Sequence, residues 1–367
     1  MRHPSVYLDW YVRVPKVKYD FRSSGIAFFK HNLDLGSVNL SINYENGNPE
    51  ALKQVGRWYN VEPENVFISS EGASGQNARI IRYLAERNPE KREAIVEFPT
   101  YEPLLRTTQE YFPKVKRLER MEKEEYKLDA ERLEHIVSKK TGLLVLTNPH
   151  APSGAISNRN ELKEIMDIAN QHDFYVLCDE IYAEFDRKTV PSLFSVDPNL
   201  SIVTTSFTKA YGLGGVKLGI ALTKEELVKE LFTDVLNTVG NSPNIVQVIA
   251  AELLDKAARR LQEHKTKWAR LKKETEKWLT ENKLEYFPNK VSVTYWVKLP
   301  ITDTYNWINQ TAIPKHGLAP VPGAFFLFKE DYDLARSNRI RLGIGLMDPE
   351  TTILTEALGA LKAALKK

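Results

Sequence analysis

The chain has 367 residues, of which 42% are hydrophobic and 27% charged, and its formal net charge is +3. This composition is typical of a soluble globular protein with room for two domains, and its balanced charge does not point to nucleic acid as a partner. There is no apolar run of membrane-spanning length, no apolar core of a signal peptide near the N-terminus, and only one cysteine, Cys178. We therefore expect a cytoplasmic protein without an internal disulfide and without membrane or nucleic-acid partners.

The N-terminal part of the chain differs from the rest. Its first 44 residues are rich in aromatic side chains but contain no long periodic segment, and prolines and a glycine interrupt them. We expect an N-terminal arm with short strands there. Gly47-Asn48-Pro49 then predicts the start of a helix, because proline is favoured at the first helical position.

Short apolar runs alternate with helical segments from Val66 to about Thr223. This alternation predicts an α/β domain whose mostly parallel sheet is covered by helices. The apolar runs span residues 66–68, 94–96, 143–146, 174–177, 202–203 and 218–222, and the helical segments include 78–85 and 162–170.

The last third of the chain begins with a long helical pattern. Ser242-Pro243 indicates an N-cap followed by proline at the first helical position, and helical spacing continues to about Asn282. That length predicts either a break or an exposed spanning helix. The remainder favours a smaller α+β domain, with strands over 292–299 and 339–344 and a terminal helix from Pro349. We expect a large domain over 45–283 and a small domain formed by 284–367 with the arm, 1–44.

Lys209 is the strongest candidate for chemistry. It follows a β-branched run and precedes a glycine-rich turn. A lysine just beyond a buried strand is partly desolvated, which favours the neutral amine that attacks carbonyls. Hydroxyls of Ser206 and Thr208, at −3 and −1, can hold an anion beside it. The stretch suits a Schiff-base lysine next to a phosphorylated aldehyde cofactor, but a surface lysine before an ordinary turn explains it equally well.

Three loops after predicted strands add weaker signals. Gly72 lies in a strand-to-helix turn where a phosphate can approach backbone amides, although many α/β proteins use glycine there. Tyr101 can stack on a flat ring or simply pack between prolines. His150 has no second histidine or cysteine nearby, so we interpret it as a turn histidine rather than a base or metal ligand. At the carboxyl ends of parallel strands these loops share one crevice.

Charged side chains follow two further predicted strands. Asp179 ends one of them, where a carboxylate is costly unless a cation such as a protonated pyridine nitrogen lies opposite; alternatively it caps a helix. Tyr182 is three residues on, within reach of the same ligand. Arg339 and Arg341 share one face of a strand, and either one can clamp a carboxylate or belong to a solvated charged face.

In their order and spacing these segments resemble the fold-type I aminotransferases that depend on pyridoxal 5'-phosphate (PLP), in the branch with aspartate and histidinol-phosphate aminotransferases. The matching motifs run from Tyr44 to Arg341 and so cover most of the chain. The resemblance implies a seven-stranded large domain with a smaller α+β domain, PLP as cofactor and no metal. It also implies a homodimer with shared active sites that moves an amino group between an L-amino acid and a 2-oxo acid.

The resemblance also implies roles for individual residues. Lys209 is expected to form the aldimine with PLP and to shuttle a proton, while Asp179 pairs with the pyridine nitrogen. Tyr182 donates to the phenolate oxygen, Tyr101 stacks on the ring, and Arg341 grips the substrate α-carboxylate. The phosphate is expected among Gly72, Ala73, Ser74, Ser206, Thr208 and Lys217, with Tyr44 reaching it from the partner subunit.

Two positions depart from the family pattern. Ala151 replaces an asparagine that hydrogen-bonds the phenolate oxygen, and Lys217 replaces an arginine, which keeps the charge but loses the bidentate fork. The same cofactor chemistry also serves lyases, decarboxylases and amino-acid cyclases, because the bond that breaks depends on which one stands perpendicular to the ring. A non-catalytic PLP-binding protein is a further alternative.

Overall fold

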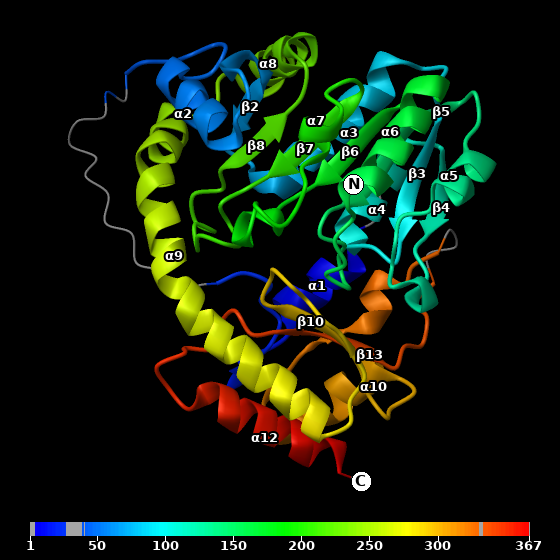
Figure 1. The fold of residues 1–367 in the computed structure, drawn as a ribbon, viewed down its shortest axis with the longest axis vertical. Helices are drawn as coiled ribbons and strands as arrows, with labels where there is room; N and C mark the ends of the chain where they lie inside the picture. Colours follow the sequence, from blue (N-terminus) through cyan, green and yellow to red (C-terminus); the bar gives the residue numbers. More distant parts are fainter. Residues whose placement is uncertain (1–3, 27–38, 40, 330–332, 367) are drawn as a thin grey trace.

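The computed structural model describes residues 4–26, 39, 41–329 and 333–366. Its largest element is a seven-stranded sheet in the order β2-β8-β7-β6-β5-β3-β4 (Figure 1). Neighbouring strands are parallel except where β8 pairs with β2 and β7. The predicted α/β architecture with a mostly parallel sheet is confirmed. The strands are β2 (Val66–Ser69), β3 (Glu93–Phe98), β4 (Lys114–Glu119), β5 (Thr141–Thr147), β6 (Tyr175–Asp179), β7 (Ser201–Thr205) and β8 (Gly219–Leu222).

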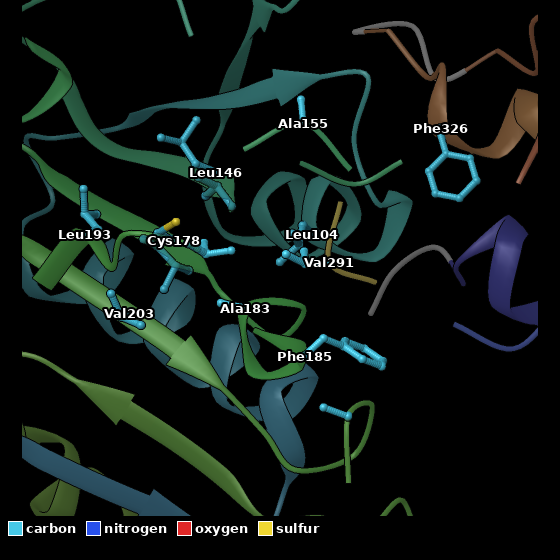
Figure 2. Packing of buried hydrophobic residues seen from close by; sticks show 14 of the residues in the cluster. Leu104, Leu146, Ala155, Cys178, Ala183, Phe185, Leu193, Val203, Val291 and Phe326 are labelled. Carbon is cyan, nitrogen blue, oxygen red and sulfur yellow. The ribbon is translucent and has the colours of Figure 1, made fainter. Parts of the chain in front are cut away.

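The interior strands of this sheet are apolar on both faces because helices cover them. Leu146, Cys178 and Val203 lie on neighbouring strands, and Leu193 of α7 packs near them (Figure 2). All four side chains are buried. The helices around the sheet are α2 (Pro49–Tyr59), α3 (Gly72–Arg87), α4 (Glu102–Tyr111), α5 (Ala130–Ile136), α6 (Arg159–His172), α7 (Leu193–Val196) and α8 (Glu225–Val239), with single turns η1 (Pro63–Asn65), η2 (Glu122–Glu124) and η3 (Ala183–Phe185).

The expected long helix is continuous. Helix α9 (Asn244–Glu281) runs for 38 residues from beside α2 to the second sheet and α12, so the spanning alternative holds and no break occurs (Figure 1). It begins one residue later than expected, because Pro243 occupies the N-cap position instead of the first helical one. No helix among the described residues has the length and apolarity that a bilayer crossing demands.

A second, smaller assembly contains a four-stranded sheet in the order β12-β13-β10-β9. Its terminal helix starts at Ile353, four residues after the expected Pro349. The domain limits 45–283 and 1–44 with 284–367 remain a prediction. The elements are β9 (Tyr286–Phe287), β10 (Thr294–Lys298), α10 (Thr304–Trp307), η4 (Ile308–Ala312), α11 (Ile313–His316), β11 (Leu318–Ala319), β12 (Val321–Pro322), η5 (Gly323–Phe326), β13 (Arg339–Gly343) and α12 (Ile353–Leu365).

The arm corrects one expectation. Residues Val6–Arg13 form helix α1 where we expected short strands; among the described residues of the arm, only Tyr19–Asp20 forms a strand, β1, which pairs with β11. Ser5 caps α1 by accepting a hydrogen bond from the Leu8 amide at 3.0 Å. Trp10 anchors it by donating from Nε1 to Asn309 at 2.9 Å. A local cap and a tertiary contact therefore hold the helix in place.

Candidate active site

A small cavity of about 70 Å³ lies where strands of the large sheet end. Thr147 and Asp179 are the last residues of β5 and β6; they pair in register, and both line the cavity. Ligands gather at the carboxyl ends of parallel strands in sheets of this kind. Of the site residues expected from the sequence, the lining contains Ala73, Ser74, Tyr101, Asp179, Tyr182 and Lys209.

Larger hollows lie on other parts of the described chain. One of about 880 Å³ contains the ion pair between Asp129 and Arg132, and one of about 590 Å³ contains the pair between Glu122 and Arg339. The amine and carboxylate predicted from the sequence lie instead in the smaller space of about 70 Å³.

Lys209 is half-buried and reaches the cavity from the loop after β7. Burial among protein atoms is the main cause that lowers the pKa of its amine to about 8, and the charges of Arg341 and Lys217 act in the same direction. Asp179 opposes this shift. The desolvated lysine expected from the strand-end position therefore has a neutral amine within reach of ordinary pH.

Asp179 has both carboxylate oxygens fixed by donors. Oδ2 accepts from Asn77 Nδ2 at 2.8 Å, and Oδ1 accepts from the Ile181 amide at 3.0 Å. Asn77 is fixed in turn, because Thr204 Oγ1 donates to its Oδ1 at 2.5 Å. Burial raises the pKa of Asp179, and these hydrogen bonds hold the rise back. An opposing cation would stabilise the carboxylate further.

Asn77 is a site residue that the sequence patterns did not single out. It sits in the interior of α3, where a polar side chain is usually solvated. A signal was present, however. Asn77 is four residues after Ala73, so both residues lie on one face of the helix, and Ala73 was already expected at the site.

The residues expected around a phosphate lie on two adjoining segments. Ser206 Oγ and Thr208 Oγ1 are 2.7 Å apart, close enough for both hydroxyls to contact one anion. Gly72 begins α3, and its amide donates to the Lys217 carbonyl at 2.6 Å. The next amides, of Ala73 and Ser74, belong to the first turn and lack intrahelical acceptors. A helix N-terminus with nearby hydroxyls and a lysine suits an anion.

Gly72 is required at its position. Its φ is +66°, in the left-handed region that side chains rarely adopt, and it brings α3 against the loop after Lys209. Lys217, the residue that replaces the family's arginine, has a φ of +56°. Both residues of this contact therefore have a left-handed backbone conformation.

The two strand arginines have different environments. Arg339 ion-pairs with Glu122 and, at 3.0 Å, with Glu285. Arg341 is 3% exposed and donates from Nη2 to Tyr7 Oη at 3.2 Å and to the Arg22 carbonyl. Its Nε is buried without a hydrogen-bond partner among the described residues. A buried guanidinium with an unsatisfied donor is suited to bind a carboxylate, and Arg339 is not.

Three tyrosines surround the space near Lys209. Tyr101 and Tyr7 pack edge-to-face with ring centroids 5.7 Å apart. Burial raises the pKa of Tyr182, and a hydrogen bond with Ser24 lowers it. All three phenols and Ser24 line the cavity. Tyr44, expected to act across a subunit boundary, is half-buried and lies outside the lining, so its role remains a prediction.

The segment after the arm helix touches Lys209 directly, which the sequence patterns did not indicate. The Ile26 amide donates to the Lys209 carbonyl at 2.9 Å. A Cβ atom on Gly25 would lie 2.8 Å from the Lys209 Cα, so glycine permits this close approach. These contacts join positions nearly two hundred residues apart, and local sequence patterns carry no signal for them.

His150 is structural, in agreement with its interpretation as a turn histidine. Its Nε2 lies 2.9 Å from the Pro99 carbonyl, and its Nδ1 lies 2.7 Å from Ser153 Oγ. Nε2 must carry the proton to donate to the carbonyl, which leaves Nδ1 to accept from the serine. Burial lowers the pKa of His150, so the ring stays neutral.

Comparisons with known proteins agree on one family. The model of the family "Aminotransferase class I and II" matches residues 23–358. An aspartate aminotransferase of Pyrococcus horikoshii is 28% identical over 234 residues, which cover 61% of this chain and 58% of that protein. A histidinol-phosphate aminotransferase of Methanococcus aeolicus is 22% identical, covering 49% and 47%. The chain spans about half the length of the curated relatives it matches.

Solved structures share the fold along the whole chain. An aspartate aminotransferase mutant of Thermus thermophilus superposes with a TM-score of 0.81 at 20% identity, covering all of both chains. A PLP-dependent aminotransferase of Streptococcus suis gives a TM-score of 0.83 at 22% identity, covering 100% of this chain and 98% of that one. At such identities these structures establish the fold alone.

Proposed function

Since the chain belongs to the class I and II aminotransferase family, we propose that it moves an amino group between an L-amino acid and a 2-oxo acid, with PLP bound around Lys209. The observation that carries the proposal is the amine of Lys209, with its pKa lowered to about 8, in one cavity with the fixed carboxylate of Asp179. PLP, when bound, supplies a ring that accepts electrons from the amino acid's Cα.

The residues present fit this cofactor in kind. Asp179 suits the pyridine nitrogen, Tyr101 a ring face and Tyr182 the phenolic oxygen. Hydroxyls and the first-turn amides of α3 suit the phosphate. The cavity of about 70 Å³ is one part of the proposed cofactor site, because four of the residues expected at the phosphate, Gly72, Ser206, Thr208 and Lys217, lie beyond its lining.

The protein groups then have separate tasks. Asp179, fixed by Asn77, holds a proton at the pyridine nitrogen. Arg341 uses Nε to orient the substrate α-carboxylate beside Lys209. The neutral Nζ of Lys209 would take the proton from Cα of the substrate and deliver it to the cofactor carbon to which the amino group is attached. Its low pKa supports this task, because a base titrating near the working pH is both available and able to release its proton.

We further propose a cytoplasmic homodimer in which Tyr44 reaches the partner's phosphate site. Its half-buried ring lies outside the cavity of its own chain. Sedimentation velocity tests the dimer, and mixing Y44F with K209A protomers tests the sharing. If sites are shared, the mixed dimers regain one site with both residues intact and so recover activity that neither variant has alone.

The proposed reaction is tested with the purified full-length protein loaded with PLP. Borohydride reduction should fix PLP covalently on the peptide that contains Lys209; K209A should lose this label, and the exposed K224A control should retain it. A panel of amino acids should convert bound PLP stoichiometrically into its pyridoxamine form. Release of ammonia or carbon dioxide without that form would indicate a lyase or decarboxylase, and absence of the label would refute the site.

A further inference from the structure

A buried carboxylate lies behind Lys209 and has no part in the mechanism above. Glu184 is 2% exposed, in the turn η3 that follows the strand of Asp179. Its Oε1 accepts from Tyr59 Oη at 2.7 Å and from Thr205 Oγ1 at 3.1 Å, and its Oε2 accepts from Tyr211 Oη at 3.1 Å. Three hydroxyls, one from α2 and two from residues 205–211, therefore meet on one carboxylate.

Two of these donors flank the Lys209 loop. Thr205 is the last residue of β7, just before the loop, and Tyr211 lies two residues after Lys209. Glu184 thus joins the two ends of the segment 205–211 through one carboxylate. The ring of Tyr211 also packs edge-to-face on Phe207, with centroids 4.9 Å apart. The residues inside this closed segment include the hydroxyls expected at the phosphate.

The third donor does not belong to the loop. Tyr59 ends α2, on a different part of the fold, and Arg187 stacks on its ring at 3.9 Å. The Arg187 Nε lies 3.9 Å from Glu184 Oε1 and partly balances its charge. Removing the Tyr59 hydroxyl therefore leaves both connections between Glu184 and the loop intact. A variant without the Tyr59 hydroxyl is therefore a control for loss of a hydrogen bond to Glu184 that does not involve the loop.

The donors remain donors at any working pH. Burial raises the pKa of Tyr59 and of Tyr211 well above the ordinary value, so both phenols keep their protons. A carboxylate out of water needs such partners, and hydrogen bonds to a charged acceptor are short and directional. On the other side of the loop, Ile26 and Gly25 hold the Lys209 backbone. The lysine is fixed from two directions.

We propose that Glu184 is a positioning residue that clamps the Lys209 loop through Thr205 and Tyr211, and so sets where the amine and the phosphate-side hydroxyls lie. Its catalytic meaning rests on the proposed function. The clamp itself is a property of the protein without cofactor and can be measured there. No contact between Glu184 and substrate or cofactor is needed, because it acts through Tyr211 and Thr205.

The test compares Y211F, Y59F and E184A with wild type as full-length protein without PLP. Hydrogen exchange of the amides in 205–211 is followed by mass spectrometry, and the pH dependence of Lys209 acetylation gives its pKa. Y211F and E184A should speed exchange about tenfold, as expected for loss of one hydrogen bond in a locally opening segment. They should also move the pKa of Lys209 upward, towards the ordinary 10.5, because water enters.

Y59F is the matched control and should leave exchange and the Lys209 pKa at wild-type values. An equal effect of Y59F and Y211F would overturn the clamp, since the network would then stabilise the region without preference for the loop. Unchanged Y211F would overturn it too, even if E184A fails to fold. Amino transfer by the wild type is measured separately. The clamp can hold while no transfer is found, and transfer can be found while the clamp fails.

Discussion

Arg341 gives the sharpest test of how the proposed site recognises substrate. In R341M the guanidinium disappears while an apolar chain remains against the rings of Tyr7 and Phe326, which lie 5.8 and 5.7 Å from the Arg341 guanidinium carbon. The variant removes the buried Nε donor that has no partner among the described residues. We expect binding of a 2-oxo acid to weaken and the pKa of Lys209 to rise.

The magnitude follows from the contacts. A hydrogen bond to a charged group contributes about 1.5–3 kcal/mol, and two such bonds from a fork would contribute about 3–6. One amine of the fork, Nη2, already serves Tyr7 and the Arg22 carbonyl, so the lower end applies. A loss of about 3 kcal/mol raises the dissociation constant roughly a hundredfold. Arg341 is the largest charge that lowers the Lys209 pKa, so its removal favours the protonated amine.

Isothermal titration with pyruvate and 2-oxoglutarate measures the affinity, and the acetylation profile measures the pKa of Lys209. R341K keeps the charge without the fork and should fall between wild type and R341M. R339M is the matched control and should bind normally, because Arg339 is occupied by carboxylates of the protein. Binding by a folded R341M within about threefold of wild type, or an equal loss in R339M, would refute the assignment.

Three further outcomes are expected. N77A removes a donor that lowers the pKa of Asp179, so this pKa rises and kcat/KM falls about tenfold; a loss under about twofold would contradict the role. Burial raises the pKa of Glu180 to about 8, so the free energy of unfolding of the wild type should decline as pH rises from the unfolded pKa of about 4.5 towards 8. E180Q should escape this penalty, which is on the order of 1 kcal/mol per pH unit. Urea midpoints of wild type and E180Q that change equally between pH 5 and pH 8 would exclude this effect. G25A places a Cβ 2.8 Å from the Cα of Lys209 and should cost about 1–3 kcal/mol in thermal unfolding. G359A, with open space around it in a helix, should instead stabilise the protein by up to about 1 kcal/mol.

The sheet was predictable because its central strands are buried on both faces and therefore form continuous apolar runs. The edge strand β4, Lys114–Glu119, was not predicted, since its side chains are mostly charged or half-buried. Helix α1 was not predicted for a different reason. Its eight residues lie between prolines, and long-range contacts such as that of Trp10 with Asn309 hold them in a helix. Propensity alone does not form so short a helix.

The residues of the candidate site likewise fall into those that the sequence indicated and those that it did not. Asp179 and Lys209 were singled out from the sequence because Asp179 ends β6 and Lys209 lies in the loop after β7, and strand ends can be predicted from apolar runs. Asn77 and Glu184 contact partners about 100 and about 20 residues away in the chain, respectively, and neither directly ends a predicted strand. Such supporting residues are fixed by which strands become neighbours, a fact that emerges only from the assembled sheet.

Position 151 shows how distant segments complete this cavity. Where the family pattern has an asparagine, Ala151 lines the space without a polar group. Thr147 cannot replace that donor, because its hydroxyl donates to Glu97 at 2.5 Å and accepts from the Ala151 amide at 2.8 Å. Ser24 does reach the cavity, where its hydrogen bond lowers the pKa of Tyr182 and so strengthens the phenol as a donor.

The segment that carries Ser24 also holds the Lys209 carbonyl through Ile26. A shift of residues 24–26 would therefore change the donor at Tyr182 and the backbone support of Lys209 together. The N-terminal segment is therefore part of the site's electrostatics as well as its wall.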